Sequence, residues 1–308
     1  MSPVSHTVPL TVLWRGRLSG CNYDCNYCPF AKRTDSRQTL AKDHAALTRF
    51  VDWILARRVE SSVLFTPWGE ALVRRYYREA IVQLSHGVHI RKVAIQTNLS
   101  APLNWLVECD LSRVGIWATW HPDQVSLDRF LKKIVRLQAL GVAYSVGVVA
   151  VREHLPQIER LRVQLPSDAY MWINAEESIQ GCYTPAEIER LSTLDPLFEL
   201  NNRAYASQGR ACATGHRVIS VNDDGTAWRC HFVKTPLGSI YEPDFEARLH
   251  PSPCPQQNCH CHIGYSHLDD LGLADIFGQG FLERRACRPQ REDALKAIER
   301  FRRKADRA

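Results

Sequence analysis

Three cysteines near the start of the chain have a spacing that suits metal chemistry. Cys21, Cys25 and Cys28 are separated by three and then by two residues. Three thiolates on one tight loop can hold a [4Fe-4S] cluster and leave one iron without a protein ligand, where a small molecule can react. Zinc is the alternative for a Cys-x2-Cys pair, but it requires a fourth ligand, and the next candidates along the chain are His44 and Cys109.

A second cysteine group lies in the last third of the chain. Its members are Cys212, Cys230, Cys254, Cys259 and Cys261. Two strands are predicted over 216–221 and 226–232, because an Asp-Gly turn between two such runs is a strong hairpin signal. A zinc knuckle that includes His262 is an alternative to an iron-sulfur cluster in this region, since histidine is an equally good zinc ligand.

Predicted strands and helices alternate along the chain that must position the two cysteine groups. Strands are predicted over 10–15, 63–66, 92–97, 114–119, 143–151 and 170–174. Helices are predicted over 40–58, 72–85, 126–140, 156–163 and 184–194. Such alternation indicates βα units and an α/β fold with a parallel sheet. In these folds the ligand lies at the carboxyl ends of the strands, so the residues that follow each strand are the candidates for chemistry.

The cluster loop Cys-Asn-Tyr-Asp-Cys-Asn-Tyr-Cys resembles that of the radical S-adenosylmethionine (SAM) superfamily. The resemblance implies a partial (β/α)6 barrel, formed here by residues 1–200, and a [4Fe-4S] cluster held by the three cysteines. It also implies that SAM binds the open iron through its amino and carboxylate groups. Tyr27, just before the third cysteine, stands where the superfamily places an aromatic ring against the adenine.

Two further segments match this superfamily in the right order. Gly69 and Glu70 follow the second predicted strand and resemble the Gly-Gly-Glu element that receives the SAM amino group, although Trp68 replaces the first glycine. Thr97 and Asn98 follow the third strand and resemble the Thr-Asn pair that closes over the methionine and ribose. Either segment alone is typical of ordinary turns. Their combination with the cluster loop supports a SAM site.

Aromatic and acidic residues are expected at the open mouth of the barrel. Trp120, His121 and Asp123 follow the fourth strand, and Glu176 and Glu177 follow the sixth. Carboxylates in a dry site would pair with an amine-bearing substrate through charge-assisted hydrogen bonds. The alternative is a helix cap at Asp123 and a solvated side chain at Glu177.

The second cysteine group resembles the auxiliary-cluster domains called SPASM or Twitch. Cys212, Gly225 and Cys230 have the spacing that opens those domains, which implies a small C-terminal auxiliary iron-sulfur region over residues 201–308. One four-cysteine cluster then uses four of the five cysteines. The expected ligands are Cys212, Cys230, Cys259 and Cys261, and Cys254 is expected to be spare.

One auxiliary cluster and one spare thiol resemble the inventory of the radical SAM epimerases of aminoglycoside biosynthesis. The resemblance implies two [4Fe-4S] clusters, SAM, and an electron donor such as flavodoxin or ferredoxin. It implies an aminoglycoside substrate, with neomycin C converted to neomycin B, and hydrogen return from Cys254. A peptide maturase is the alternative enzyme. It would usually carry a peptide-binding module before the barrel, and the first strand is predicted within about ten residues of Met1.

Composition and charge narrow the classes further. The 308-residue chain is 45% apolar, shows no transmembrane run and lacks the start of a signal peptide, so we expect a cytoplasmic protein with no membrane partner. Eleven cysteines in that compartment indicate metal binding or catalysis rather than disulfides. Residues 284–308 contain ten basic and four acidic residues, which equals the whole net charge of +6. A basic helix over 291–307 without interleaved aromatic residues does not favour nucleic-acid binding.

Overall fold

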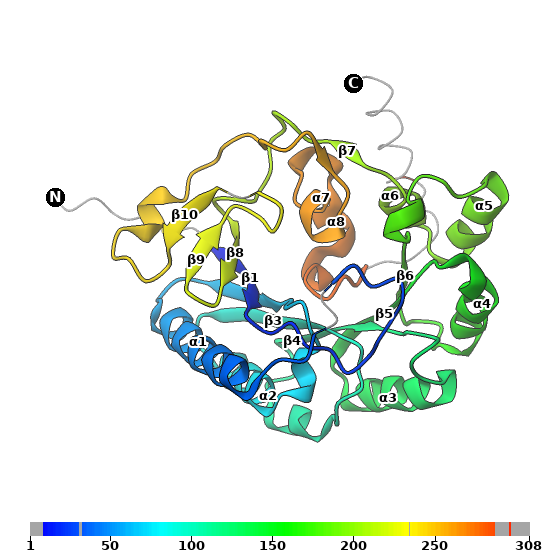
Figure 1. Cartoon of the computed structure of the whole chain (residues 1–308), viewed down its shortest axis with the longest axis horizontal. Helices are drawn as coiled ribbons and strands as arrows, with labels where there is room; N and C mark the ends of the chain where they lie inside the picture. The colour runs from blue at the N-terminus through cyan, green and yellow to red at the C-terminus, as the bar shows by residue number, and fades with distance from the viewer. Residues whose placement is uncertain (1–8, 31–32, 234, 287–295, 297–308) are drawn as a thin grey trace.

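A single nine-stranded sheet organises the chain. The computed structural model describes residues 9–30, 33–233, 235–286 and 296, and Figure 1 shows the whole chain. The sheet has the strand order β10-β9-β8-β1-β2-β3-β4-β5-β6. The strands β1 to β6 are parallel neighbours. Their bounds are Leu10–Gly16, Ser61–Phe65, Ile90–Thr97, Val114–Thr119, Ala143–Val149 and Met171–Asn174.

All six strands predicted from the apolar runs are therefore present, and the α/β fold class is confirmed. The C-terminal part of the chain extends the same sheet, because β8 (Val218–Asn222) pairs in parallel with β1. Next come the antiparallel strands β9 (Thr226–Trp228) and β10 (Pro236–Ser239). A separate ladder joins β7 (Tyr205–Ala206) to β11 (Asn258–Cys259).

Helices cover the outer face of the sheet, while the C-terminal helices lie on the opposite face (Figure 1). The outer helices are α1 (Arg37–Ala56), α2 (Arg75–Ser85), α3 (Leu127–Leu140) and α4 (Leu155–Gln164). The others are α5 (Pro185–Leu194), α6 (Phe198–Asn201), α7 (His262–Tyr265) and α8 (Leu273–Phe277). None of the helices in the described ranges is both long and apolar enough to cross a bilayer.

Alternation along the strands builds two cores. Val12 and Trp14 of β1 belong to the outer core beneath the helices, whereas Leu13 faces the inner core. The inner core joins inward side chains of the strands, such as Trp117 and Trp172, to side chains from the C-terminal region. Those C-terminal members are Cys212, Val218, Ile263, Tyr265, Leu268, Leu273, Phe277, Leu282 and Ala286. The C-terminal region therefore fills the concave side of the sheet.

Two predicted elements differ from the structure for local reasons. The helix predicted over 72–85 begins at Arg75, because Glu70 caps the N–H of Leu72 in a short 3-10 turn and Arg74 is extended. The strand predicted over 226–232 ends at Trp228, so Cys230 lies in the loop that follows β9. The basic helix predicted over 291–307 lies, apart from Lys296, outside the described residues.

Candidate functional site

Two carboxylates, one of them fully buried, fix the chain that leads into the first cysteine loop. Asp43 of α1 is fully buried and accepts hydrogen bonds from the N–H groups of Arg17 and Leu18, at 2.7 and 3.1 Å. Asp35 accepts from the N–H groups of Ser19 and Gly20. Burial raises the pKa of Asp43, and these hydrogen bonds oppose that rise. The sequence analysis did not single out either carboxylate, because neither belongs to a motif.

Gly69 lies directly against the same stretch of chain. Its N–H donates to the carbonyl of Leu18 at 3.3 Å, and the N–H of Glu70 donates to the carbonyl of Gly20 at 3.2 Å. A Cβ at position 69 would lie 2.1 Å from the carbonyl oxygen of Gly20, which is far inside contact distance. The glycine is therefore required for the loop after β2 to approach the cysteine loop.

The carboxylate of Glu70 joins the loop after β2 to the end of β3. Its Oε1 accepts from the hydroxyl of Thr97 at 2.7 Å and from the N–H of Leu72 at 3.0 Å, and its Oε2 accepts from the N–H of Asn98 at 2.6 Å. Glu70 is only 4% exposed, and burial raises its pKa while these bonds oppose the rise. Each carboxylate oxygen can accept two hydrogen bonds. Oε2 therefore keeps capacity for one further donor.

Asn98 connects this carboxylate to the cysteine loop. Its side-chain amide donates to Oδ1 of Asn22 at 3.0 Å and lies 3.8 Å from Sγ of Cys21. The residues that resemble the SAM motif at positions 69, 70, 97 and 98 are thus connected to one another and to the loop that carries the three cysteines. Sequence order alone could not establish these contacts.

His121, which follows β4, packs against the first cysteine loop. Its Nδ1 is 2.9 Å from the hydroxyl of Tyr27 and 3.2 Å from Sγ of Cys25, and its ring stacks near that of Tyr27. Burial lowers the pKa of His121 to about 4. Next to it, Asp123 pairs with Nε2 of His154 at 2.9 Å. The predicted substrate residues after β4 thus already have protein partners.

The other mouth residues divide into buried and exposed ones. Trp120 is 3% exposed, donates its indole N–H to the carbonyl of Val125 at 3.0 Å and packs in the outer core. Glu176 is partly buried and accepts from the hydroxyl of Ser178, while Glu177 is exposed. Glu176 and Glu177 thus place two carboxylates on the chain just after β6.

The structure brings the second cysteine group together from distant segments. Burial raises the pKa of Cys259 to about 12, and the charges of Cys261, Cys230, Cys254 and Cys212 contribute to the rise. All four thiols therefore lie within electrostatic range of Cys259. Across the described ranges of the chain, no three histidine, cysteine or carboxylate side chains form a group that could hold a single metal ion.

Two buried arginines face this region from the inner side of the sheet. Arg15, at the end of β1, is 6% exposed, donates to the carbonyl of Thr66 at 2.8 Å and stacks on Trp68 at 4.1 Å. Arg284 is 2% exposed, donates to Oδ1 of Asn174 at 2.6 Å and stacks on Trp172 at 4.6 Å. Nothing in the local sequence indicated that these two cations are buried.

Neither arginine has a full set of partners. The Nε atoms of Arg15 and Arg284 are buried without a hydrogen-bond partner, and neither guanidinium forms an ion pair with another described residue. Arg284 lies within electrostatic range of the Asp195 carboxyl group, but it forms no direct ion pair with it, and a buried cation without a hydrogen-bonded counter-charge is costly. A thiolate-bound iron-sulfur cluster would bring negative charge and sulfur acceptors, so these orphaned N–H groups fit such a cluster at the second cysteine group.

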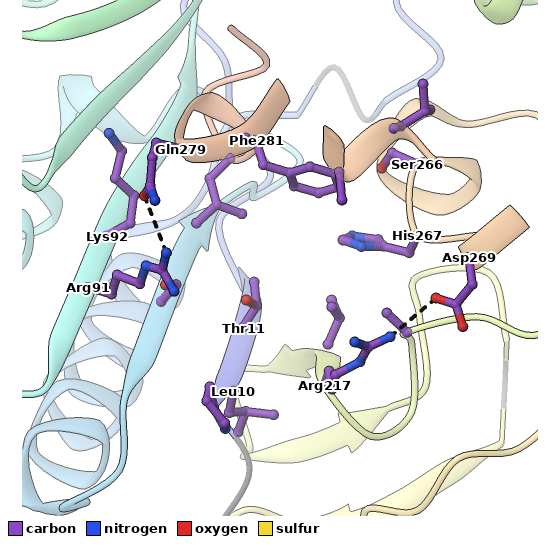
Figure 2. Close-up of a pocket in the computed structure, with 18 of the residues that line it drawn as sticks. Leu10, Thr11, Arg91, Lys92, Arg217, Ser266, His267, Asp269, Gln279 and Phe281 are labelled. Atoms are coloured by element: carbon purple, nitrogen blue, oxygen red, sulfur yellow. Dashed lines mark hydrogen bonds and ion pairs between the residues drawn. The ribbon is translucent and has the colours of Figure 1, made fainter. Parts of the chain in front are cut away.

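A cavity of about 270 Å³ lies between the SAM-like motif and the second cysteine group. Its lining includes Arg15 and Trp68 on one side and His231, next to Cys230, on the other. A different cavity of about 470 Å³ lies at the amino ends of β1, β2 and β3, far from the strand ends that carry the cysteine loop. Figure 2 shows that Arg217 in this second cavity is paired with Asp269.

Comparisons with known proteins identify related folds. No protein-family model and no curated protein sequence matches the chain. A structure described as native anSMEcpe with bound AdoMet and Kp18Cys peptide matches with a TM-score of 0.56 and 14% identity, over 95% of this chain and 96% of that one.

Two further structures are similar over much of the chain. Native anSMEcpe with bound AdoMet has a TM-score of 0.55 and 14% identity, over 95% of this chain and 96% of that one. BtrN in complex with AdoMet and 2-DOIA has a TM-score of 0.41 and 15% identity, over 78% of this chain and 81% of that one. The chain thus shares the fold of anSMEcpe, which binds AdoMet in these structures.

Proposed function

We propose that this protein is a radical SAM enzyme, and specifically an epimerase that inverts one carbon stereocentre of an aminoglycoside. The observation that carries the proposal is the connection of the Cys-x3-Cys-x2-Cys loop to Gly69, Glu70 and Asn98 at the carboxyl ends of the strands. AdoMet in the solved structures of similar fold supports the choice of cofactor. When bound to a reduced cluster, SAM supplies the radical that removes a hydrogen atom from carbon.

The residues of the first site take the following proposed roles. Cys21, Cys25 and Cys28 would hold the cluster and leave one iron open for SAM. The unused acceptor capacity of Glu70 Oε2 suits the SAM amino group, which is a cation with N–H donors. Gly69, Thr97 and Asn98 would complete the pocket, and Tyr27 would pack on the adenine.

The second cysteine group supplies the other half of the proposed reaction. A neutral thiol that faces the substrate can return a hydrogen atom to the opposite face of the carbon, so an S–H bond breaks and a C–H bond forms. One electron and one proton then restore the thiol. We propose that four of the five cysteines would hold a cluster, which would supply this electron, with a ferredoxin or a flavodoxin as the electron donor.

For the substrate we propose a polyamine sugar, with neomycin C converted to neomycin B as the reaction to test first. Glu176 and Glu177 have exposed or partly exposed carboxylates, and Asp123 keeps a half-exposed carboxylate beside His154. These groups suit the ammonium groups of an aminoglycoside. His121 would hold the cysteine loop in place through Tyr27, and Trp120 would anchor the chain after β4 in the outer core.

The test is anaerobic turnover of the reconstituted protein with SAM, reductant and neomycin C in heavy water. Neomycin B that carries one non-exchangeable deuterium is the expected product, because the returned hydrogen comes from an exchangeable thiol. Chromatography and mass spectrometry measure it. Absence of 5′-deoxyadenosine would overturn the assignment to radical SAM enzymes, and 5′-deoxyadenosine with an unchanged sugar would overturn only the substrate.

A peptide maturase is the second candidate function. One of the structures of similar fold, with a TM-score of 0.56, is described with a bound peptide, and its match covers 95% of this chain. The same turnover assay, repeated with a candidate peptide in place of neomycin C, distinguishes the two. A peptide product with one altered residue would favour the maturase.

A further inference from the structure

The cavity of about 470 Å³ at the amino ends of β1, β2 and β3 takes no part in the proposed reaction, and its size suits a small molecule. Four neighbouring strands form its floor. The floor residues are in-register neighbours on β8, β1, β2 and β3, namely Val218, Thr11, Ser62 and Lys92. The opposite wall comes from the residues after α7 and from Phe281 (Figure 2). The cavity therefore lies between the sheet and the C-terminal region, at the other end of β1 from the first cysteine loop.

Several polar groups that line this cavity have no partner in the protein. Four of them form no hydrogen bond with another described residue, namely the ring of His267 and the hydroxyls of Thr11, Ser62 and Ser266. His267 is only 7% exposed and Ser266 only 5% exposed. The imidazole of His267 points into the cavity (Figure 2). A buried polar group without a partner is costly, so these groups call for a ligand that can bond them.

The four groups share one kind of hydrogen-bonding chemistry. A serine or threonine hydroxyl both donates and accepts, and a neutral imidazole does the same through its two nitrogens. Burial, and to a smaller extent the charge of Arg217, lower the pKa of His267 to about 4, so the ring is neutral near pH 7. Ligand hydroxyl groups match such partners, because they also donate and accept. A carboxylate can only accept and an ammonium group can only donate.

The charges around the cavity are already balanced. Each cation of the lining pairs with a carboxylate: Arg91 with Glu60 at 2.9 Å, Lys92 with Glu283 at 3.0 Å and Arg217 with Asp269 at 3.2 Å. No lining charge is therefore left over to attract an ion. The wall instead offers an apolar surface, because the ring of Phe281 lies 5.2 Å from that of His267. Aromatic lining with a few polar groups is typical of small-molecule sites.

We propose that this cavity binds a neutral polyhydroxylated ring compound, of the class of a monosaccharide or a cyclitol. Its hydroxyl groups would bond Thr11 and Ser62 on the floor and His267 on the wall, while its C–H groups would pack on Phe281. The site lies at the opposite end of the sheet from the proposed SAM site. It therefore stands independently of the proposed function.

The test is a saturation-transfer NMR titration of the reconstituted full chain with D-glucose and with myo-inositol. Glucose 6-phosphate and glucosamine are the charged comparators. At least one of the two neutral compounds should give a saturable signal. The charged comparators should bind more weakly, because the cavity offers no unpaired counter-charge for a phosphate or an ammonium group.

Two variants remove hydrogen-bonding groups of the site one at a time. His267→Phe keeps the aromatic contact with Phe281 but removes both ring nitrogens, and Thr11→Val removes one hydroxyl with little change of shape. Each should weaken binding about three- to tenfold. His250→Phe, at an exposed histidine outside the lining, is the matched control. It and Glu177→Gln, at the carboxyl end of the sheet, should bind as wild type does.

The outcomes are separable. Absence of saturable binding of both neutral compounds would show that the cavity holds only water, and would overturn the assignment. Equal or tighter binding of a charged comparator would overturn it as well, as would unchanged binding in both Thr11→Val and His267→Phe. Weaker binding in Glu177→Gln would place the compound at the mouth of the barrel instead. Thermal unfolding checks each variant, and Thr11→Val decides alone if His267→Phe does not fold.

Discussion

The two cysteine groups are built in opposite ways. The first places three thiols within the eight residues from Cys21 to Cys28, on one loop after β1. The second collects five thiols from the fifty residues between Cys212 and Cys261. A local group can be recognised from spacing, because the chain itself sets the distances between neighbouring residues. A dispersed group has no such constraint, and its ligand set depends on packing.

The contacts that hold the two cysteine groups in place also differ. The first loop is fixed by Asp35, Asp43 and the backbone next to Gly69. The second depends on several long-range pairings, such as Cys259 in the β7 and β11 ladder and the bridge from Cys212 to Leu268. We therefore expect changes at the first group to act on SAM chemistry and changes at the second to act on a later step.

The largest effects are expected from serine substitutions of one cysteine in each group. Cys25→Ser should abolish SAM cleavage and lower the iron content from about eight to about four, because it removes a ligand of the proposed SAM cluster. Cys230→Ser should lose the same amount of iron but still form 5′-deoxyadenosine. Iron assays and chromatography of 5′-deoxyadenosine measure both. A Cys25→Ser protein that cleaves SAM would contradict the comparison.

Two glycine substitutions should break one group each. Gly69→Ala places a Cβ 2.1 Å from the carbonyl oxygen of Gly20, so we expect a loss of about 1–3 kcal/mol in the free energy of unfolding, with iron lost at the first site. Gly225→Ala acts on the turn between β8 and β9, which precedes Cys230, because Gly225 has a φ of +86° and the added Cβ would meet the ring of Tyr241. We expect a loss of about 1–3 kcal/mol there too.

Urea unfolding and iron content measure both glycine variants. Gly141→Ala is the matched control, since Gly141 ends α3 with a φ of +71° and open space around it. It should cost about 1–2 kcal/mol from backbone strain and leave both clusters loaded. If Gly69→Ala retained all its iron, the close approach of the two loops would not matter for the site.

A smaller effect is expected at Glu70. Glu70→Gln removes one acceptor oxygen from a carboxylate that serves Thr97, Leu72 and Asn98, so the unfolding free energy should fall by about 1–3 kcal/mol. SAM affinity should fall about tenfold, which corresponds to about 1.4 kcal/mol. Calorimetric titration of SAM measures this effect. Glu177→Gln, at an exposed side chain, should change neither quantity, and an unchanged SAM affinity in Glu70→Gln would remove its proposed role.

The smallest effect is a pH dependence that belongs to the fold alone. Burial raises the pKa of Asp195, and Arg284 and three hydrogen bonds oppose the rise. A carboxyl group with a raised folded-state pKa binds protons better when folded, so its contribution to stability is full below the unfolded pKa of about 4 and is lost as the pH rises through the folded value.

Unfolding free energies measured in urea between pH 4 and pH 7 should therefore fall less steeply for Asp195→Asn than for wild type. Asp168→Asn, on the loop before β6, is a control that should keep the wild-type slope. An identical slope in the wild-type and Asp195→Asn proteins would show that Asp195 is not protonated more readily in the folded state.

The chain order of apolar runs was enough to predict the parallel sheet. All six strands predicted before residue 175 are present, and the helix predicted over 184–194 is α5, which begins with a capping box of Thr184 and Glu187. Local periodicity and capping act over a few residues, so one sequence contains them. The return strand is shorter than predicted and leaves Cys230 in a loop, because its pairing with β8 covers only two residue pairs.

By itself the sequence determined the cysteine loop, the order of the motifs behind it and the α/β fold, because each depends on spacing or on short-range periodicity. Tertiary structure alone decided which side chains meet. It joined Glu70 to Asn98, buried Arg15 and Arg284 on the inner face, and paired the strand of Cys259 with that of Tyr205. Those outcomes depend on how the C-terminal region packs into the concave side of the sheet, and long-range packing has no signature in residue spacing.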